Sequence, residues 1–424
     1  MTTTAGQDAD GTGGPAVGDD AGPGSRTSRG RGAATRADVA RLAGTSSAVV
    51  SYVINDGPRP VAAATRERVL TAIAELDYRP NAVARALKTQ QTQTLAMLVP
   101  DIANPFFAEF ARAVQDAAFE QGKVLLLGDS GGSLQRETAY LRRFLDQRVE
   151  GIVLIGARRD SSLRIVEASG VPAVVLDRQL DEGAAISSVG IDNKSAALAA
   201  TEHLIGHGHR AIACVAGPSE QRNATDRLAG WATALHRAGI APDPALIHVD
   251  DFSVEGGVRA GRALLDVPDA PGGGTRRPRA DDAGEPSQEP PRRPAHRPTA
   301  VFVSSDSQAE GLLAVAHRLG LRVPQDLAVL GFDGTRRSAY SDPAMSVVEQ
   351  PLLAAAAAAV ALLAPGRGRR TRSGDSTLGA RVVRTPVEHV VLGFSLVIRR
   401  SCGCSPDQSP PDGPWDTTAE GVRS

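Results

Sequence analysis

The chain has 424 residues, of which 42% are hydrophobic and 22% charged, and its formal net charge is -1 at pH 7. This length allows two or three domains with a real core, and the balanced charge gives no overall basic signal for nucleic acid. Three cysteines are too few for a disulfide framework. The amino terminus has no signal-peptide pattern, and no apolar run is long enough to span a bilayer. We therefore expect a cytoplasmic protein without a membrane partner.

A small helical head is predicted over residues 34–80, after a disordered tail (residues 1–33) that is too poor in large apolar side chains to fold. A helix near 36–43 and a second helix capped by Ser46 are joined by a tight turn at Gly44. Two short helices joined by a glycine turn form the layout of a helix-turn-helix. Each helix has an apolar face. In the first helix it is formed by Val39, Leu42 and Ala43, and in the second by Val49, Val50, Val53 and Ile54. A third helix follows, with an apolar face formed by Val69, Ile73 and Leu76.

The charge of this region differs from that of the whole chain. Between Arg31 and Gln91, nine Arg or Lys stand against five Asp or Glu, a surplus of four positive charges. A head that faces phosphates needs such a surplus, although solvated surfaces also carry one by chance. After Tyr78-Arg79-Pro80 ends the third helix, Asn81 is predicted to cap a short segment over 82–88.

From Thr94 onward, buried-strand patterns alternate with amphipathic helices. Strands are expected at 95–99, 124–127, 151–155, 173–176, 212–215, 246–249, 300–303 and 327–330. Two successive series of this kind predict an α/β fold with two parallel-sheet lobes over 93–402, and a ligand site between the lobes at the carboxyl ends of the strands. Residues 267–298, with eight prolines, and 365–380 are expected to be disordered insertions, and 403–424 a disordered tail.

Two short patterns raise the question of a metal site, and we expect neither to bind one. Cys402-Gly403-Cys404 lacks a second ligand pair, and His207-Gly208-His209 falls in a turn before a strand. The thiols are therefore expected to be reduced and incidental. No nucleophile elbow, phosphate loop or dinucleotide fingerprint follows a strand, so we expect no enzyme and no cofactor.

These residues resemble the LacI family of transcriptional regulators over about residues 35–402, apart from the two insertions. In the head, the resemblance rests on 38–44 (DVARLAG), Ser46, 50–55 (VSYVIN), 65–69 (TRERV) and 78–82 (YRPNA). In the remainder it rests on 99–107 (VPDIANPFF), 227–230 (RLAG), 304–306 (SSD), 330–333 (LGFD) and 350–351 (QP). It implies a helix-turn-helix head (34–80), a hinge helix and linker (81–92), and a two-lobed effector-binding and dimerisation domain like the type I periplasmic binding proteins.

In this family the second helix lies in the major groove, and its base-reading positions match Ser47, Ala48 and Tyr52 here. The family commonly has Arg where Tyr52 stands and Thr where Val49 stands, so the base preference should differ from that of better-known members. The alternative for Tyr52 is a partly buried ring that supports the head. Four side chains are suited either to phosphate contact or to local capping: Ser46, Ser51, Asn55 and Thr65. The expected DNA-binding residues also include Thr35, Asn81 and Ala84.

The segment 81–88 matches the family's hinge helix, and Leu87 matches a leucine that wedges into the minor groove and kinks the DNA. Eight residues are too few for a stable helix in water, so we expect this segment to be disordered off DNA and to fold on it. The alternative is a solvated linker helix in which Leu87 packs on its own domain.

The resemblance also implies an effector pocket between the lobes. Its expected aromatic, cationic and acidic members are Phe106, Phe107 and Phe252; Arg227; and Asp177, Asp306 and Asp333, each at the end of a strand. Core packing is the alternative for each phenylalanine. Convergent carboxylates with an arginine suit a sugar, whereas the same rings also suit a purine.

We therefore predict a homodimeric repressor that binds a near-palindromic double-stranded DNA operator under the control of a small effector, with a sugar favoured. Lobe closure on the effector would couple the pocket to the operator. The alternatives are a regulator that responds to a purine or another metabolite, and a ligand-binding module without a regulatory role.

Overall fold

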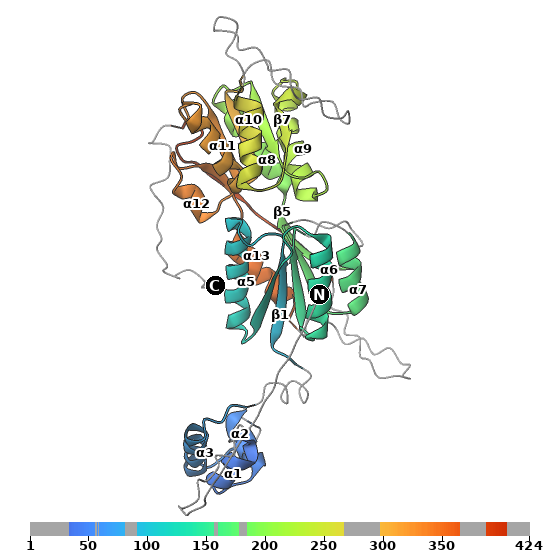
Figure 1. The fold of residues 1–424 in the computed structure, drawn as a ribbon, viewed down its shortest axis with the longest axis vertical. Coiled ribbons are helices and arrows are strands. Elements are labelled where there is room, and N and C mark those ends of the chain that lie inside the picture. Colours follow the sequence, from blue (N-terminus) through green and yellow to red (C-terminus); the bar gives the residue numbers. More distant parts are fainter. Residues whose placement is uncertain are drawn as a thin grey trace, which may run out of the picture. The chain divides into compact units, whose positions relative to one another are not determined.

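The computed structural model describes residues 34–55, 57, 59–80, 91–156, 160–177, 185–266, 297–364 and 387–404 (Figure 1). Contacts divide the chain into two compact units, Met1–Thr89 and Gln90–Ser424. The hinge positions Asn81, Ala84 and Leu87 lie outside the described residues, as do the amino-terminal tail and most of the expected insertions and carboxyl-terminal tail.

The first unit contains three helices, α1 (Arg36–Leu42), α2 (Ser47–Ile54) and α3 (Ala63–Glu75). Thr35 and Asp38 form a capping box at the start of α1, and the Ser46 hydroxyl accepts a hydrogen bond from the amide of Val49 at the start of α2. Gly44 adopts a φ of 62° in the turn between α1 and α2, a conformation that favours glycine. The predicted helix-turn-helix is therefore present.

One predicted core position of the head is wrong. Leu42 is 50% exposed, whereas Val39, Ala40 and Ala43 are buried. A helix turns about 100° per residue, so the stripe formed by these three residues leaves Leu42 about 100° away from its centre. The small core also includes Val50, Val53, Val69, Ala72 and Tyr78.

The second unit contains two lobes, each built on a six-stranded sheet. In lobe 1 the strand order is β11-β5-β4-β3-β1-β2, and in lobe 2 it is β12-β10-β9-β8-β6-β7. The strands of lobe 1 are β1 (Thr94–Val99), β2 (Val124–Asp129), β3 (Gly151–Ile155), β4 (Ala173–Leu176), β5 (Ser187–Ile191) and β11 (His389–Leu392). Those of lobe 2 are β6 (Ile212–Ala216), β7 (Ile247–Val249), β8 (Ala300–Val303), β9 (Ala328–Asp333), β10 (Ser346–Glu349) and β12 (Ser395–Val397).

Helices cover both faces of each sheet. Lobe 1 has α5 (Pro105–Glu120) and α13 (Leu352–Leu362) on one face and α6 (Leu134–Asp146) and α7 (Asp160–Ser169) on the other. Lobe 2 has α8 (Asn193–Gly206) and α9 (Arg222–Arg237) on one face and α10 (Val254–Leu265) and α11 (Asp306–Arg318) on the other, with η1 (Pro244–Leu246) and α12 (Arg336–Ala339) in its loops. Strands buried on both faces are continuous apolar runs, which is why the pattern predicts a parallel α/β fold.

All eight predicted strands are present, but four more were not predicted: β5, β10, β11 and β12. All the described strand pairs are parallel except β10 with β12, which run antiparallel. The chain crosses between the lobes three times, from β5 to α8, from β10 to α13 and from β11 to β12. Among the described residues, no helix has both the length and the apolar character that a membrane span requires.

Candidate functional site

The exposed surface of α2 lies at its amino-terminal turn. Ser46, Ser47 and Ala48 are exposed, whereas Val50 and Val53 of the same helix are buried in the head. The described part of the head therefore presents the first turn of α2 outward. Side chains near the start of a recognition helix are the ones that reach base edges, so the position of this turn suits the predicted reading role.

Tyr52 is half-buried and packs against the turn that follows α2. The backbone of Gly57 lies so close to this ring that a Cβ at residue 57 would come within 2.4 Å of it. The amide of Gly57 also donates to the carbonyl oxygen of Tyr52, over 3.0 Å. The ring therefore supports the head, while its role in reading bases stays a prediction.

The polar residues expected at the DNA backbone that the structure describes, Thr35, Ser46, Ser51, Asn55 and Thr65, make local hydrogen bonds. Asn55 donates to the carbonyl and hydroxyl oxygens of Ser51, at 2.9 and 3.2 Å. Thr65 accepts from Arg68, and Thr35 and Ser46 cap their helices. These bonds fulfil the local role that the sequence left open, and contact with phosphate stays a prediction.

In the second unit, Arg227 forms the centre of a buried polar cluster between the lobes. This side chain from α9 is 2% exposed. Its Nε donates to Oδ1 of Asn193 over 2.8 Å, and its Nη1 donates to the carbonyl oxygen of Ser304 over 2.7 Å. Its guanidinium carbon lies 3.7 Å from the centre of the Phe332 ring. Two hydrogen bonds and one aromatic ring therefore hold the guanidinium group of Arg227 in place.

Two of the predicted aspartates face this arginine. Nη2 of Arg227 lies 3.3 Å from Oδ1 of Asp177, and Nη1 lies 3.5 Å from Oδ1 of Asp333. Asp177 follows β4 of lobe 1, whereas Asp333 ends β9 of lobe 2, so Arg227 connects the two lobes. Both aspartates adopt a positive φ, 64° for Asp177 and 112° for Asp333, a strained conformation that recurs at functional sites.

Burial changes the protonation of these carboxyl groups. It raises the pKa of Asp177, although Arg227 and a hydrogen bond from Asn223 oppose this effect. Burial, with the charges of Asp306 and Asp177, raises the pKa of Asp333 well above its usual value against the opposing effect of Arg227. One arginine therefore faces two carboxyl groups whose pKa values are raised by burial.

Asp306 is buried nearby but holds a neighbouring loop. Its Oδ2 accepts from the amide and the hydroxyl of Thr335, each over 2.7 Å. Burial raises the pKa of Asp306 to about 7. Its direct contact with a ligand stays a prediction.

The three predicted aromatics lie in different surroundings. The half-buried ring of Phe252 packs over Gly217, with its centre 5.7 Å from the guanidinium carbon of Arg227, so it borders the polar cluster. Phe106 and Phe107 are instead buried in the core of lobe 1, with ring centres 5.3 Å apart. The structure thus shows the core-packing role for these two, and stacking on a ligand stays a prediction.

Several polar residues of the cluster were not predicted as site residues. Asn223 donates to Asp177 over 2.7 Å, and Gln350 donates to Asp333 over 3.1 Å. Asn193, which accepts from Arg227, begins α8. Asn223 could have been found, because it lies one helical turn before Arg227 on α9. Gln350 follows β10, a strand that the sequence pattern did not reveal.

A small pocket adjoins the cluster where the chain crosses between the lobes. It is lined by Asp177 and Gln350 from the cluster and by apolar side chains of lobe 1, among them Phe110, Leu352 and Leu392. Asp177 thus connects the polar cluster with an opening that has apolar walls.

The structure also corrects the expectation about metal ligands. Cys402 and Cys404 do meet a second ligand pair, formed by His203 of α8 and by His207, which caps the carboxyl end of that helix. His209, the histidine considered with His207, instead bonds to Thr299. The signal that could have revealed the pair is the four-residue spacing of His203 and His207 at the end of a helical pattern.

Comparison with family models matches nearly the whole described chain. Residues 35–81 match the model of the bacterial regulatory proteins of the lacI family. Residues 92–270 match the periplasmic binding proteins and sugar binding domain of the LacI family, and 201–402 match a periplasmic binding protein-like domain.

Curated relatives and solved structures give the same picture. The HTH-type transcriptional repressor CytR of Escherichia coli (strain K12) is 34% identical over 319 residues, which cover 75% of this chain and 85% of that protein. The HTH-type transcriptional repressor PurR of Photobacterium profundum is 33% identical over 320 residues, 75% and 87% of the two chains. The Lac repressor dimer bound to operator and the anti-inducer ONPF is similar with a TM-score of 0.68 at 27% identity, over 87% of this chain and 99% of that chain. The CelR–cellobiose complex is similar with a TM-score of 0.59 at 31% identity, over the same shares.

Proposed function

The chain belongs to the LacI family of bacterial regulatory proteins, and from this premise we propose a homodimeric repressor whose affinity for its operator is set by a sugar bound between its two lobes. Members of this family are DNA-binding transcription regulators under the control of small effectors. The proposal adds the class of effector, the residues that bind it and the residues that contact DNA.

The observation that carries the proposal is the Arg227–Asp177 ion pair between the lobes. A sugar can accept from the guanidinium and donate to Asp177 and Asp333 through neighbouring hydroxyl groups. It would thereby replace a direct contact between the lobes with contacts of its own. A ligand shifts a conformational equilibrium only through such differential contacts, so this pair is the element that couples binding to lobe geometry.

Two comparisons favour a sugar over a purine. The model that matches residues 92–270 includes the sugar binding domain of the family, and one similar solved structure holds cellobiose. The charge of the cluster agrees with this choice, because two carboxyl groups and one guanidinium offer acceptors and donors on several sides. Phe252 would supply the apolar ring that stacks on the face of a sugar.

At the DNA, Ser47 and Ala48 would contact base edges from the first turn of α2. Tyr52 and Val49 would offer an aromatic ring and methyl groups in place of charged donors, which favours contact with thymine methyl groups. Ser46, Ser51, Asn55 and Thr65 would contact phosphate groups, and Thr35, Asn81 and Ala84 would complete the DNA-binding surface. Leu87 would wedge into the minor groove at the centre of the operator.

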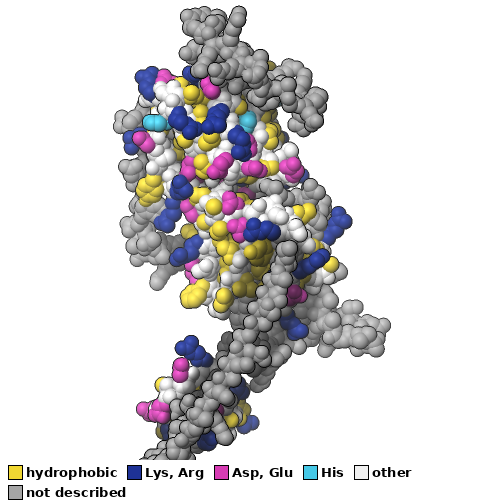
Figure 2. All heavy atoms as spheres, viewed as in Figure 1, with side chains coloured by type: hydrophobic (Ala, Val, Ile, Leu, Met, Phe, Trp, Pro, Cys, Tyr) yellow, Lys and Arg dark blue, Asp and Glu magenta, His cyan; other side chains and the backbone are white. Residues whose placement is uncertain are grey.

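An apolar surface on lobe 1 supports the homodimer. Phe119 is 78% exposed and Val124 64% exposed, and both lie where α5 leads into β2 at the edge of the sheet. Figure 2 shows hydrophobic side chains gathered over lobe 1. Exposed apolar surface of this kind is typical of a protein interface, and a two-fold dimer would match a near-palindromic operator.

Two measurements on the full chain test the proposal. Selection from a pool of random duplexes should enrich a near-palindromic sequence, and a pool without enrichment would contradict the DNA-binding role. A thermal-shift screen should then find a sugar that raises the melting temperature, because a ligand of the folded state stabilises it by mass action. If only purine bases or nucleosides raise it, the class of effector is wrong although the regulatory role stands.

A further inference from the structure

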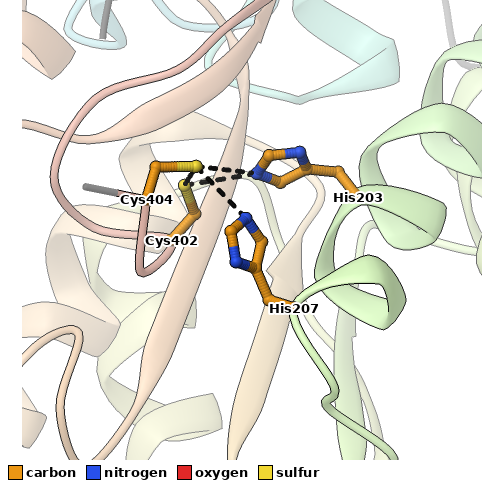
Figure 3. Close-up of side chains that lie close together, drawn as sticks. All are labelled: His203, His207, Cys402 and Cys404. Carbon is orange, nitrogen blue, oxygen red and sulfur yellow. Dashed lines mark hydrogen bonds between the residues drawn. The ribbon is translucent and has the colours of Figure 1, made fainter. Parts of the chain in front are cut away.

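Four side chains with metal-binding atoms lie together in lobe 2, away from the residues that surround Arg227. Figure 3 shows His203 of α8 and His207 at the end of this helix projecting toward Cys402 and Cys404 in the turn after β12. The ligand atoms of all four lie within 4.8 Å of one another. This cluster plays no part in the proposed binding of DNA or effector.

The fold places the four atoms together from two independent elements. His203 in the last turn of α8 and His207 at its C-cap are four residues apart, which places them on the same side of the chain, and their ring centres are 4.7 Å apart. The cysteines flank Gly403, whose φ of 96° favours glycine and turns the chain so that both thiols face α8. A residue with a side chain at position 403 would be strained in this conformation, which brings both thiols to the same side of the turn.

The turn that carries the cysteines is anchored before they begin. The Ser401 hydroxyl donates to the carbonyl oxygen of Val329 over 2.6 Å and accepts from the amide of Ser346 over 2.8 Å. Cys402 is buried in the core between the sheet of lobe 2 and α8. The thiols therefore stand on a scaffold held by two strands.

We propose that His203, His207, Cys402 and Cys404 bind a zinc ion. Tetrahedral zinc at about 2.3 Å from sulfur and about 2.0–2.1 Å from nitrogen requires ligand atoms about 3.3–3.8 Å apart. Nε2 of His203 lies 3.3 Å from Sγ of Cys402 and 3.5 Å from Sγ of Cys404. Nε2 of His207 lies 3.2 Å from Sγ of Cys404, and the two sulfur atoms are 3.4 Å apart. These separations are close to those that the ion requires.

The ligand set identifies both the ion and its role. Two thiolates and two imidazoles favour zinc over magnesium or calcium, which prefer oxygen ligands. Two thiolates neutralise the charge of Zn²⁺, and the two thiol protons pass to solvent when the ion binds. Four protein ligands leave no position open for water or substrate, as in structural zinc sites. The ion would fasten the end of the described chain to α8.

Cobalt substitution tests the site directly. The full chain, kept reduced with a phosphine, is titrated with Co²⁺ and then with Zn²⁺. We expect a thiolate-to-cobalt charge-transfer band and the intense visible bands of tetrahedral cobalt, saturating at one equivalent per chain and lost when zinc displaces the cobalt. Zinc should also raise the melting temperature of the apoprotein. Saturation without these bands would overturn the proposal.

Variants separate the ligands from other histidines. His207→Ala alters an exposed side chain, so the fold should survive, and Cys404→Ser keeps the size of the side chain. Because loss of an outer-shell partner alone weakens metal affinity by about 10–100-fold, each variant should weaken zinc binding by at least about tenfold. His236→Ala, at an exposed position of α9, is the matched control and should bind like the wild type. Equal zinc affinity in all the proteins would refute the site, as would a Cys402–Cys404 disulfide that persists under reduction and leaves no metal bound.

Discussion

Arg227 of lobe 2 and Asp177 of lobe 1 form a buried ion pair between the lobes, with Nη2 3.3 Å from Oδ1 and neither side chain more than 6% exposed. The same arginine also faces Asp333 and stacks on Phe332. Taking these charges out of water is costly, so the cluster depends on each partner being present. The pair therefore contributes to the integrity of the domain as well as to the proposed ligand site.

Replacement of the central arginine should have a large effect on stability. Arg227→Ala leaves two buried carboxyl groups without their cation, and we expect the free energy of unfolding to fall by about 3–5 kcal/mol. Urea denaturation measures this change. Arg237→Ala on the same helix removes an exposed ion pair with Glu202 and should cost only about 0–1 kcal/mol. Equal losses would show that the cluster has no special role.

Arg227→Ala should also remove the effector response, because Arg227 is an expected residue of the effector pocket. The burial of this side chain adds a stability cost to that expectation. Asp177→Asn is a milder change and is the better test of the effector response. We expect this variant to weaken the thermal shift caused by the sugar. A variant with the response of the wild type would place the ligand elsewhere.

At the DNA, Ser47→Ala should weaken binding to the selected operator. A hydrogen-bonding side chain that reads a base is worth about 1–3 kcal/mol of discrimination, so affinity for the operator should fall about tenfold while affinity for random DNA stays the same. Fluorescence anisotropy with both duplexes measures the difference. Ala74→Ser on the exposed surface of α3 is a suitable control. A uniform loss for both duplexes would indicate a backbone contact instead.

The hinge makes a separate prediction that rests on sequence. Leu87→Ala should weaken operator binding far more than nonspecific binding, because the wedge forms only on a kinked site. Electrophoretic circular-permutation assays should show a smaller bend in the operator. An equal loss of affinity for operator and nonspecific DNA would contradict the wedge hypothesis.

The buried carboxyl group of Asp306 should make stability depend on pH. Burial raises its pKa from 3.8 to about 7, so the folded state binds this proton more tightly than the unfolded state does. The stability contribution of this group is therefore fully favourable below about pH 4 and is lost as the pH rises toward 7. Asp306→Asn keeps an oxygen for Thr335 and should flatten the decline in unfolding free energy between these pH values. Parallel profiles of variant and wild type would contradict this.

The ends of the proline-rich segment lie close together. Nε of Arg297 donates to the carbonyl oxygen of Leu265 over 3.0 Å. Deletion of Gly272 to Pro294 therefore leaves a short connection between α10 and β8 that needs no rearrangement. Loop entropy changes by only about 0.6 kcal/mol for each halving of length, so the melting temperature should move by about 2–4 °C. A large decrease would show that the segment contributes to the core.

Much of the fold follows from the sequence because central strands are continuous apolar runs. β3 and β4 have the predicted bounds, residue for residue. β5 escaped prediction because its residues, Ser187–Ile191, are mostly small or polar, although all five are buried. β11 and β12 pair with strands that are far away along the chain, and such pairing has no local signal.

The candidate site was predictable to a similar degree. Arg227, Asp177 and Asp333 do meet, because parallel strands bring their carboxyl ends to one edge of each sheet. Asn223 could also be identified from its spacing to Arg227 on α9. The amides of Asn193 and Gln350 could not be identified from the sequence, because they reach the cluster only through the crossings between the lobes. The cysteine pair looked incidental for the same reason, since its partner histidines lie some two hundred residues earlier.

The last two strands of the described chain give an edge to each lobe, β11 to the first sheet and β12 to the second. During synthesis, five strands of lobe 1 emerge before those of lobe 2, but β11, which completes lobe 1, emerges only after five strands of lobe 2. A premature stop codon before residue 389 would therefore damage both lobes at once and leave two unpaired sheet edges open to aggregation. Neither lobe can be expressed as one continuous stretch of the gene, because both lobes depend on the short segment that carries β11 and β12.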